Sequence, residues 1–153
     1  MSNTETIINQ CIYETVYVVG VFDMFHRGHV ELLRRSRALG ERLVVALNGD
    51  EMVRSYKRLP IYSEQDRLAI VKACRYVDEA FIIREYDNKP ALLEHQVSAV
   101  VHGDDWTGDD YLKQICVDQK FLDKHGIEMI YLPTTKGVST TDLIERIRNI
   151  DSV

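Results

Sequence analysis

The sequence predicts an α/β protein with a Rossmann-like open parallel sheet of about five strands and helices on both faces. Continuous apolar runs rich in β-branched residues recur along the chain. Strands that are buried on both faces of a parallel sheet have this pattern. Segments with the helical spacing of apolar residues separate these runs. Such alternation of strands and helices is typical of βαβ units.

Length and composition indicate one globular domain. The chain has 153 residues, of which 45% are hydrophobic and 28% are charged. We expect residues 1–12 to form an N-terminal tail or docking arm and residues 13–153 to form a single domain. The net charge of −5 argues against nucleic acid or an anionic membrane as a partner. No apolar run approaches the ~20 residues that a membrane span needs.

The N-terminal residues and the cysteines favour a cytoplasmic protein. The first ten residues lack the basic and then apolar pattern of a secretory signal. The three cysteines, Cys11, Cys74 and Cys116, are an odd number and form no CxxC pair. We therefore expect reduced thiols, as is usual in a reducing compartment.

The first half of the domain begins with a buried strand over residues 14–21. A helix over 27–39 follows, and we expect Gly40 to end it as a C-cap. The apolar run 43–47 predicts the second strand, and the turn signal Asn48-Gly49-Asp50 precedes a short helix over 51–54. Residues 56–60 form a basic loop, because Pro60 disfavours regular structure there.

The second half continues the same alternation. Ser63 is a predicted N-cap, with Asp66 completing an approximate capping box. The expected elements then follow in order: a strand at 79–83, a helix at 90–96, a strand at 98–101, one long helix at 110–125 and a strand at 128–132. Gly126 is expected to end the long helix, and Ser139 to cap a last helix with Asp142 three residues on.

Two histidines mark the point where the first strand gives way to a helix. His26 and His29 lie at the carboxyl end of that strand, where open α/β sheets bind ligands. They also lie at a helix N-terminus, which attracts phosphate. Gly20 and Gly28 allow a ligand to approach the backbone closely. A zinc site is the alternative, but it needs a third protein ligand, and none stands at a recognisable offset.

Four motifs in these positions resemble a known family. Gly-Val-Phe-Asp-x-x-His-x-Gly-His, at residues 20–29, resembles the signature of the HxGH nucleotidyltransferase superfamily. Three further motifs resemble those of its cytidylyltransferase branch, most closely the glycerol-3-phosphate cytidylyltransferases: Arg75-Tyr76-Val77-Asp78, Gly103-Asp104-Asp105-Trp106 and Lys136-Gly137-Val138-Ser139-Thr140-Thr141. The motifs occur in the family's order, and together they cover residues 14 to about 148.

The resemblance implies a nucleotidyltransferase domain that transfers CMP from CTP to a small phosphorylated substrate. It implies Mg²⁺ held mainly by phosphates, with no side-chain metal ligand, and a homodimer. His26, His29 and Lys57 would be catalytic. The nucleotide would contact Gly20, Phe22, Asp23, Gly28, Gly103, Asp105, Trp106, Thr135, Val138, Ser139, Thr140 and Thr141. The acceptor would contact Arg58, Arg75, Asp78 and Lys136.

Several individual roles stay open at this point. Asp23 either orients a histidine or holds metal-bound water. Arg75 and Asp78 have a second interpretation as an internal salt bridge or a subunit contact. Trp106 fits core packing as well as a wall for the base. The remaining histidines are expected to be bystanders: His95, His102 and His125.

The acceptor and the base also stay open. The family has an arginine after Leu-Pro in the stretch before the last motif, whereas Thr134 and Thr135 stand here. Lys136 does not replace the bidentate fork of an arginine. Glycerol 3-phosphate is the default acceptor; phosphocholine, phosphoethanolamine, a sugar phosphate or another phosphorylated small molecule are alternatives. An adenylyltransferase acting on a phosphosugar or cofactor precursor, or a non-catalytic nucleotide-binding module, are the other candidate functions.

Overall fold

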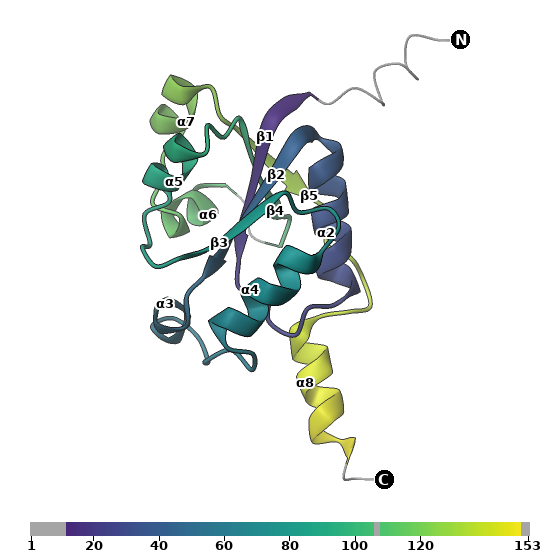
Figure 1. Cartoon of the computed structure of the whole chain (residues 1–153). Helices are drawn as coiled ribbons and strands as arrows, with labels where there is room; N and C mark the ends of the chain where they lie inside the picture. Colours follow the sequence, from purple (N-terminus) through teal and green to yellow (C-terminus); the bar gives the residue numbers. More distant parts are fainter. Residues whose placement is uncertain (1–11, 106–107, 151–153) are drawn as a thin grey trace, which may run out of the picture.

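A computed structural model describes residues 12–105 and 108–150 of the chain. Its sheet has five parallel strands in the order β3-β2-β1-β4-β5, which confirms the predicted fold class (Figure 1). The strands are β1 Tyr13–Gly20, β2 Gly40–Asn48, β3 Glu79–Ile83, β4 Ala99–Gly103 and β5 Glu128–Leu132. The predicted strands all exist, with ends shifted by up to three residues. The first eleven residues of the predicted N-terminal arm lie outside the described part of the chain.

Helices cover both faces of the sheet and give it two hydrophobic cores. They are α2 Arg27–Ala38, α3 Asp50–Arg54, α4 Glu64–Ala73, α5 Lys89–Glu94, α6 Asp109–Gln114, α7 Gln119–His125 and α8 Thr140–Arg148. Val16 and Val18 of β1 pack with residues of α2 and α4, whereas Tyr17 and Val19 pack with residues of α5, α6 and α7. Because side chains alternate along a strand, a strand with no polar side must be covered on both faces.

The prediction of a single long helix over residues 110–125 is wrong. The structure has two helices, α6 and α7, with Cys116 between them at a φ of 59°. A non-glycine residue in the left-handed region interrupts a right-handed helix. Asp118 then starts α7 as its N-cap, because its carboxylate accepts a hydrogen bond of 2.8 Å from Phe121 N.

Gly40 is also not the C-cap that we expected. α2 ends at Ala38 with Leu39 as its cap, and Gly40 is the first residue of β2. A Cβ atom on Gly40 would lie 2.6 Å from Val16 Cγ2 and 2.9 Å from Tyr13 O, so close packing against β1 requires glycine. The other predicted caps are confirmed: Ser63, Ser139 and the left-handed Gly126.

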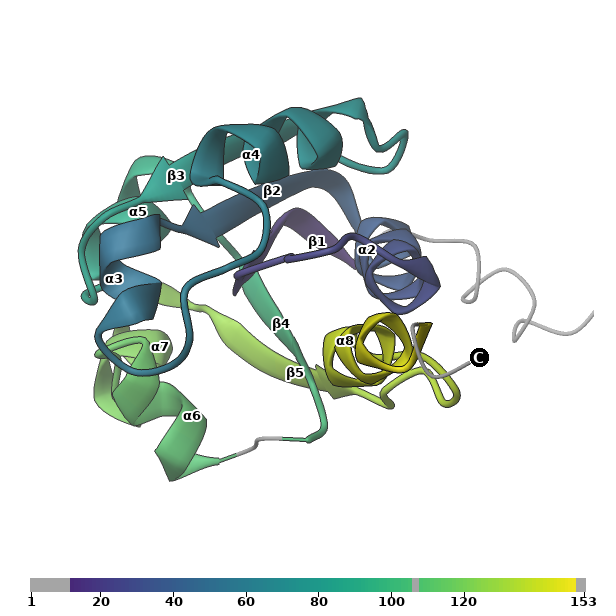
Figure 2. The same ribbon diagram turned by 90° about the horizontal axis from the view of Figure 1, so that it is seen from below.

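The sheet topology creates a ligand crevice at the carboxyl edge. The chain builds β2 and β3 on one side of β1 and then crosses to build β4 and β5 on the other. Such a switch of direction leaves a crevice above the strand ends. Figure 2 views this edge: α2 and α8 lie on one side, α3 and α6 on the other, and the loop from α3 to α4 crosses in front. Among the described residues, no helix is long and apolar enough to span a membrane.

Candidate active site

Two adjoining cavities occupy the carboxyl edge of the sheet. The α6 cavity, of about 430 Å³, extends from the end of β1 to α6 and lies against the basic loop that follows α3. The α8 cavity, of about 330 Å³, lies between the end of β1, α2 and the start of α8. Both are lined by Val19, Gly20, Val21, Phe22, His29, His102, Asp105 and Thr140. The shared lining makes them two halves of one site that meet at His29.

His26 and His29 lock each other into one arrangement at the N-terminus of α2. Their rings stack with centroids 3.8 Å apart. His26 Nδ1 accepts a hydrogen bond of 3.0 Å from Gly28 N, and His29 Nδ1 accepts one of 3.2 Å from His26 N. A neutral imidazole that accepts at Nδ1 carries its proton at Nε2. Each ring therefore has Nε2–H as its remaining donor.

The site keeps both imidazoles neutral near pH 7. Burial, with a smaller effect of the nearby His26, lowers the pKa of His29 to about 3. Burial also lowers the pKa of His26. Neutral rings at these positions cannot act as charged clamps. They can donate hydrogen bonds from Nε2 to phosphoryl oxygens and to the charge that develops there in a transition state.

The position of the His26 ring requires glycine at residue 28. A Cβ atom on Gly28 would lie 2.9 Å from His26 Cε1 and 3.0 Å from His26 Nδ1. Such contacts would push the ring away from the helix N-terminus and break the hydrogen bond that fixes its tautomer. The glycine between the two histidines is therefore explained by packing inside the motif.

The low pKa of His29 predicts a pH dependence of stability. The unfolded chain binds a proton on His29 below its ordinary pKa of 6.5, whereas the folded protein resists protonation down to about 3. The unfolded state thus holds more protons between these values, so the free energy of unfolding falls as the pH falls through this window. The slope contributed by this one group approaches ~1.4 kcal/mol per pH unit.

Urea unfolding of the wild type and of His29→Gln between pH 7.5 and about 4 measures this contribution. Glutamine does not titrate but can still accept the hydrogen bond from His26 N as an N3 capping residue. We expect a shallower pH dependence for the variant. Parallel curves would contradict the buried, neutral state of His29.

Asp23 ties the loop after β1 to the basic loop. Its carboxylate is only 5% exposed and accepts from Ile61 N at 2.8 Å, Tyr62 N at 3.0 Å and Met24 N at 3.1 Å. Arg58 Nη1 donates to it as well, at 3.3 Å. Burial raises its pKa, but these donors outweigh burial and hold the pKa below its ordinary value.

These contacts support neither of the two roles that the sequence left open for Asp23. A carboxylate offers about four lone-pair sites, and four protein donors occupy them. No histidine is among the donors. Asp23 lines the α6 cavity, but it shapes the site through the loops that it joins.

The basic loop places Lys57 and Arg58 in the lining of the α6 cavity. Burial lowers the pKa of Lys57, and the neighbouring Arg58 lowers it further. Arg58 has an ion pair of 3.3 Å with Asp23, whereas no acidic side chain among the described residues pairs with Lys57. Of these two loop cations, Lys57 is therefore the one without an acidic partner among the described residues, and it can meet a phosphate.

Most of the predicted nucleotide-binding residues meet at the α8 cavity. Ser139 Oγ accepts from Asp142 N at 3.1 Å, and Thr140 Oγ1 donates to Asp23 O at 3.1 Å. The second bond joins the N-terminus of α8 to the loop after β1, and α2 begins just beyond this loop. This cavity is lined by Gly20, Phe22, His26, Gly28, Gly103, Asp105, Thr135, Val138, Ser139 and Thr140. The positive ends of two helices therefore lie beside one hollow, which suits a polyphosphate.

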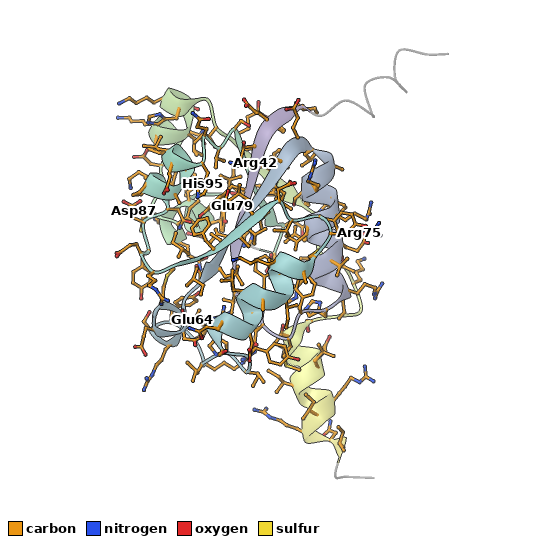
Figure 3. The ribbon with its side chains drawn as sticks, viewed as in Figure 1. Arg42, Glu64, Arg75, Glu79, Asp87 and His95 are labelled. Carbon is orange, nitrogen blue, oxygen red and sulfur yellow. The ribbon has the colours of Figure 1, made fainter. Side chains whose placement is uncertain are left out.

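Four of the predicted residues that the structure describes line neither cavity: Arg75, Asp78, Lys136 and Thr141. Thr141 and Lys136 are exposed and line neither cavity, and Trp106 lies outside the described residues. Arg75 lies in the connection from α4 to β3, which is at the amino edge of the sheet, and Figure 3 places it on the outer side near α2. Within one chain this position is on the wrong edge for acceptor binding.

Asp78 has two structural contacts within the chain. Its carboxylate accepts from Leu43 N at 2.8 Å and pairs with Arg37 Nε at 2.9 Å. An internal salt bridge was one of the interpretations left open, but the partner is Arg37 and not Arg75. This contact joins the end of α2 to the start of β3.

Sequence reasoning missed two arginines that support the site. Arg67 is fully buried, and its guanidinium donates to Val21 O at 2.8 Å, Asn48 O at 2.9 Å and Asp50 Oδ1 at 2.7 Å. It thus joins the ends of β1 and β2. Its place on the apolar stripe of α4, four residues before Val71, was the available signal. Asp50 is also bonded through its backbone and side chain to Glu64. Figure 3 labels Glu64 at the start of α4.

Arg35 is the second of these arginines. It lines the α8 cavity and donates to Pro133 O, so it ties α2 to the segment after β5. It supplies a guanidinium at the cavity whose expected arginine is replaced by Thr134. Only the packing of α2 against this segment reveals it.

The described residues contain no group of three or more His, Cys, Asp or Glu side chains that could hold a metal ion. The buried carboxylate at the site, Asp23, is saturated by protein donors. A divalent cation here would depend on oxygen ligands from a substrate, which is a common arrangement for Mg²⁺.

The comparison with known proteins decides the family. A family model described as cytidylyltransferase-like matches residues 17–146. The chain belongs to the cytidylyltransferase-like family. It is a nucleotidyltransferase, and its relatives support cytidylyl transfer from CTP to a phosphorylated small molecule as its reaction.

Two curated relatives and one solved structure give the range of similarity. A glycerol-3-phosphate cytidylyltransferase of Bacillus subtilis is 36% identical over 137 residues, which are 88% of this chain and 98% of that protein. An ethanolamine-phosphate cytidylyltransferase of Arabidopsis thaliana is 37% identical over 136 residues, which are 86% of this chain and 32% of that protein. A lipopolysaccharide core biosynthesis protein of Thermoplasma volcanium has a TM-score of 0.69 at 28% identity, over 81% of this chain and 99% of that protein.

Proposed function

We propose that this cytidylyltransferase binds CTP in the α8 cavity and a small phosphomonoester in the α6 cavity, with glycerol 3-phosphate as the default acceptor. The observation that carries this proposal is the position of His29, which lines both cavities. The reacting phosphorus of the nucleotide and the attacking oxygen of the acceptor must meet at such a junction. The similarity to a glycerol-3-phosphate cytidylyltransferase over nearly its whole length supports the default acceptor.

In the proposed reaction an acceptor phosphate oxygen attacks the α-phosphorus of CTP. A bond forms between that oxygen and the α-phosphorus, and the bond from the α-phosphorus to the bridging oxygen breaks to release pyrophosphate. His26 and His29 donate Nε2–H to the phosphoryl oxygens as their charge redistributes. Lys57 stabilises the phosphates from the side of the loop. Mg²⁺, when bound, would neutralise phosphate charge, and phosphate oxygens would hold it.

The same proposal extends to assembly and compartment. We propose a homodimer that works in the cytoplasm, where nucleoside triphosphates and phosphorylated metabolites are both present. Two free cysteines among the described residues, Cys74 and Cys116, are consistent with a reducing compartment. Sedimentation or light scattering of the purified chain tests the dimer.

Thermal shift separates CTP from ATP, because a ligand that binds the folded state raises Tm by an amount that grows with the ratio of its concentration to its Kd. We expect saturating CTP to raise Tm by about 5 °C, with a much smaller rise for ATP at the same concentration. Release of pyrophosphate from each nucleotide in the presence of glycerol 3-phosphate provides the activity arm. Preference for ATP in both assays would favour an adenylyltransferase, and binding of CTP without turnover on any acceptor would favour a non-catalytic module.

A further inference from the structure

The α6 cavity has a wall of neutral hydrogen-bonding side chains that the transfer reaction itself does not use. Gln114 at the end of α6 lines this cavity, and its amide has no protein hydrogen-bond partner among the described residues. Asn88 lines the same region and is 1% exposed; it accepts from Tyr17 at 2.6 Å and donates to Tyr86 O at 3.2 Å. The Asn88 amide is thus fixed, while the Gln114 amide is available to a ligand.

His102 adds a hydrogen-bond acceptor to this wall, although the sequence analysis expected this histidine to be a bystander. Its Nδ1 lies 2.8 Å from Gly103 O, and a carbonyl oxygen can only accept. Nδ1 therefore carries a proton, and in this tautomer Nε2 is the hydrogen-bond acceptor of the ring. The ring packs on Tyr111 with centroids 4.0 Å apart, which holds its orientation. This tautomer is the opposite of that in His29, whose Nε2 is a donor.

The cavity is wider than a three-carbon acceptor requires. It runs across the carboxyl edge from His29 of α2 to Gln114 of α6, and these helices lie on opposite sides of that edge (Figure 2). Its volume of about 430 Å³ falls in the range of pockets that enclose drug-sized ligands. An acceptor whose phosphate lies at His29 and Lys57 has room to extend toward α6.

We infer that the acceptor is a phosphorylated polyol longer than glycerol, whose hydroxyl groups are bound by Gln114 and His102. This inference rests on the proposed cytidylyl transfer at the same site, and it replaces glycerol 3-phosphate, the default acceptor, by a longer ester of the same chemical class. A hydroxyl group both donates and accepts, so it matches a wall that offers a histidine acceptor and an amide with both functions. Gln114 and His102 are then specificity-determining residues.

The same wall does not suit an acceptor with an ammonium group. Recognition of such a cation uses a carboxylate or a cage of aromatic rings. The acidic residues lining the cavity are Asp23, whose oxygens are occupied, and Asp105, which is two-thirds exposed and lies also at the α8 cavity. Tyr111 is 1% exposed and packs against His102. No acidic side chain of α6 is among the described lining residues, so an ammonium group that extends toward α6 meets no carboxylate on that helix.

The test measures pyrophosphate release with CTP and four acceptors: glycerol 3-phosphate, ribitol 5-phosphate, pentane-1,5-diol monophosphate and phosphoethanolamine. The pentanediol ester has the length of the ribitol ester without its inner hydroxyls. We expect kcat/KM to be highest for ribitol 5-phosphate, by about tenfold or more over each of the others. Gln114→Leu should lower kcat/KM for ribitol 5-phosphate about tenfold and change that for glycerol 3-phosphate by less than about threefold.

Gln119→Leu is the matched control, because it makes the same change on the neighbouring α7 outside both cavities. It should leave all four values unchanged. Efficient turnover of glycerol 3-phosphate or phosphoethanolamine with poor turnover of ribitol 5-phosphate would overturn the inference while leaving cytidylyl transfer intact. Equal loss on ribitol and glycerol esters in Gln114→Leu would overturn the role of Gln114. Absence of pyrophosphate release with every acceptor would overturn the proposed function itself.

Discussion

Replacement of His29 by alanine is expected to lower kcat by about 100-fold or more while the protein remains folded. The scale is that for removing one preorganised donor from a transition-state oxyanion. His29 lines both cavities, and its Nδ1 is held by His26 N, so its Nε2–H is the group aimed at the junction. Steady-state pyrophosphate release measures kcat, and circular dichroism with Tm reports on the fold.

Two further variants separate catalysis from helix capping. His29→Ala also removes an acceptor at the N-terminus of α2, a loss of about 1 kcal/mol in stability. His29→Gln retains that acceptor, so Tm should return toward the wild-type value while kcat stays reduced at least tenfold. His125→Ala, an exposed histidine on α7, should leave kcat unchanged. Wild-type turnover in His29→Ala would refute the assigned role.

The strands could be predicted from sequence because their cause is local. An uninterrupted apolar run has one stable environment, between two layers of helices, and the buried runs of β1, β2 and β4 follow this rule. The edge strands β3 and β5 are only partly buried. The break between α6 and α7 could not be predicted in the same way. It depends on the left-handed conformation of Cys116. Residues 110–125 contain no glycine or proline that would indicate a break in the helix.

The candidate site likewise contains some residues that could be predicted from the sequence and others that could not. The histidines and the capped α8 could be placed because strand ends and helix N-termini follow from the element order. The acceptor assignments of Arg75 and Asp78 came from resemblance alone. The element order in fact argues against them, since a connection from a helix to the next parallel strand lies at the amino edge. Gln114, His102 and Arg67 become visible only when separate elements pack together.

Asp23→Asn is expected to lower kcat/KM by about 100-fold through release of the basic loop. Asparagine has the same shape, but one oxygen becomes an NH₂ group that faces two protein donors. Either choice of oxygen breaks two of the four contacts: Met24 N with Tyr62 N, or Ile61 N with Arg58. Hydrogen bonds to a charged group contribute about 1.5–3 kcal/mol each, and the loop loses one or two of its three contacts with Asp23. Lys57 lies on this loop and should lose its fixed position at the α6 cavity.

Hydrogen exchange distinguishes this mechanism from a direct catalytic part for Asp23. Phe22 and Met24, on either side of it, have φ values of 57° and 48°, a conformation that non-glycine residues adopt only where other contacts compensate. Loss of the carboxylate should therefore free both loops, and the amides of Ile61 and Tyr62 should exchange about tenfold faster or more. Asp66→Asn, the same change at an exposed position in α4, should alter neither exchange nor turnover. If kcat fell in Asp23→Asn while those two amides kept their wild-type protection, Asp23 would act on the substrate directly, and the loop attachment would have no bearing on catalysis.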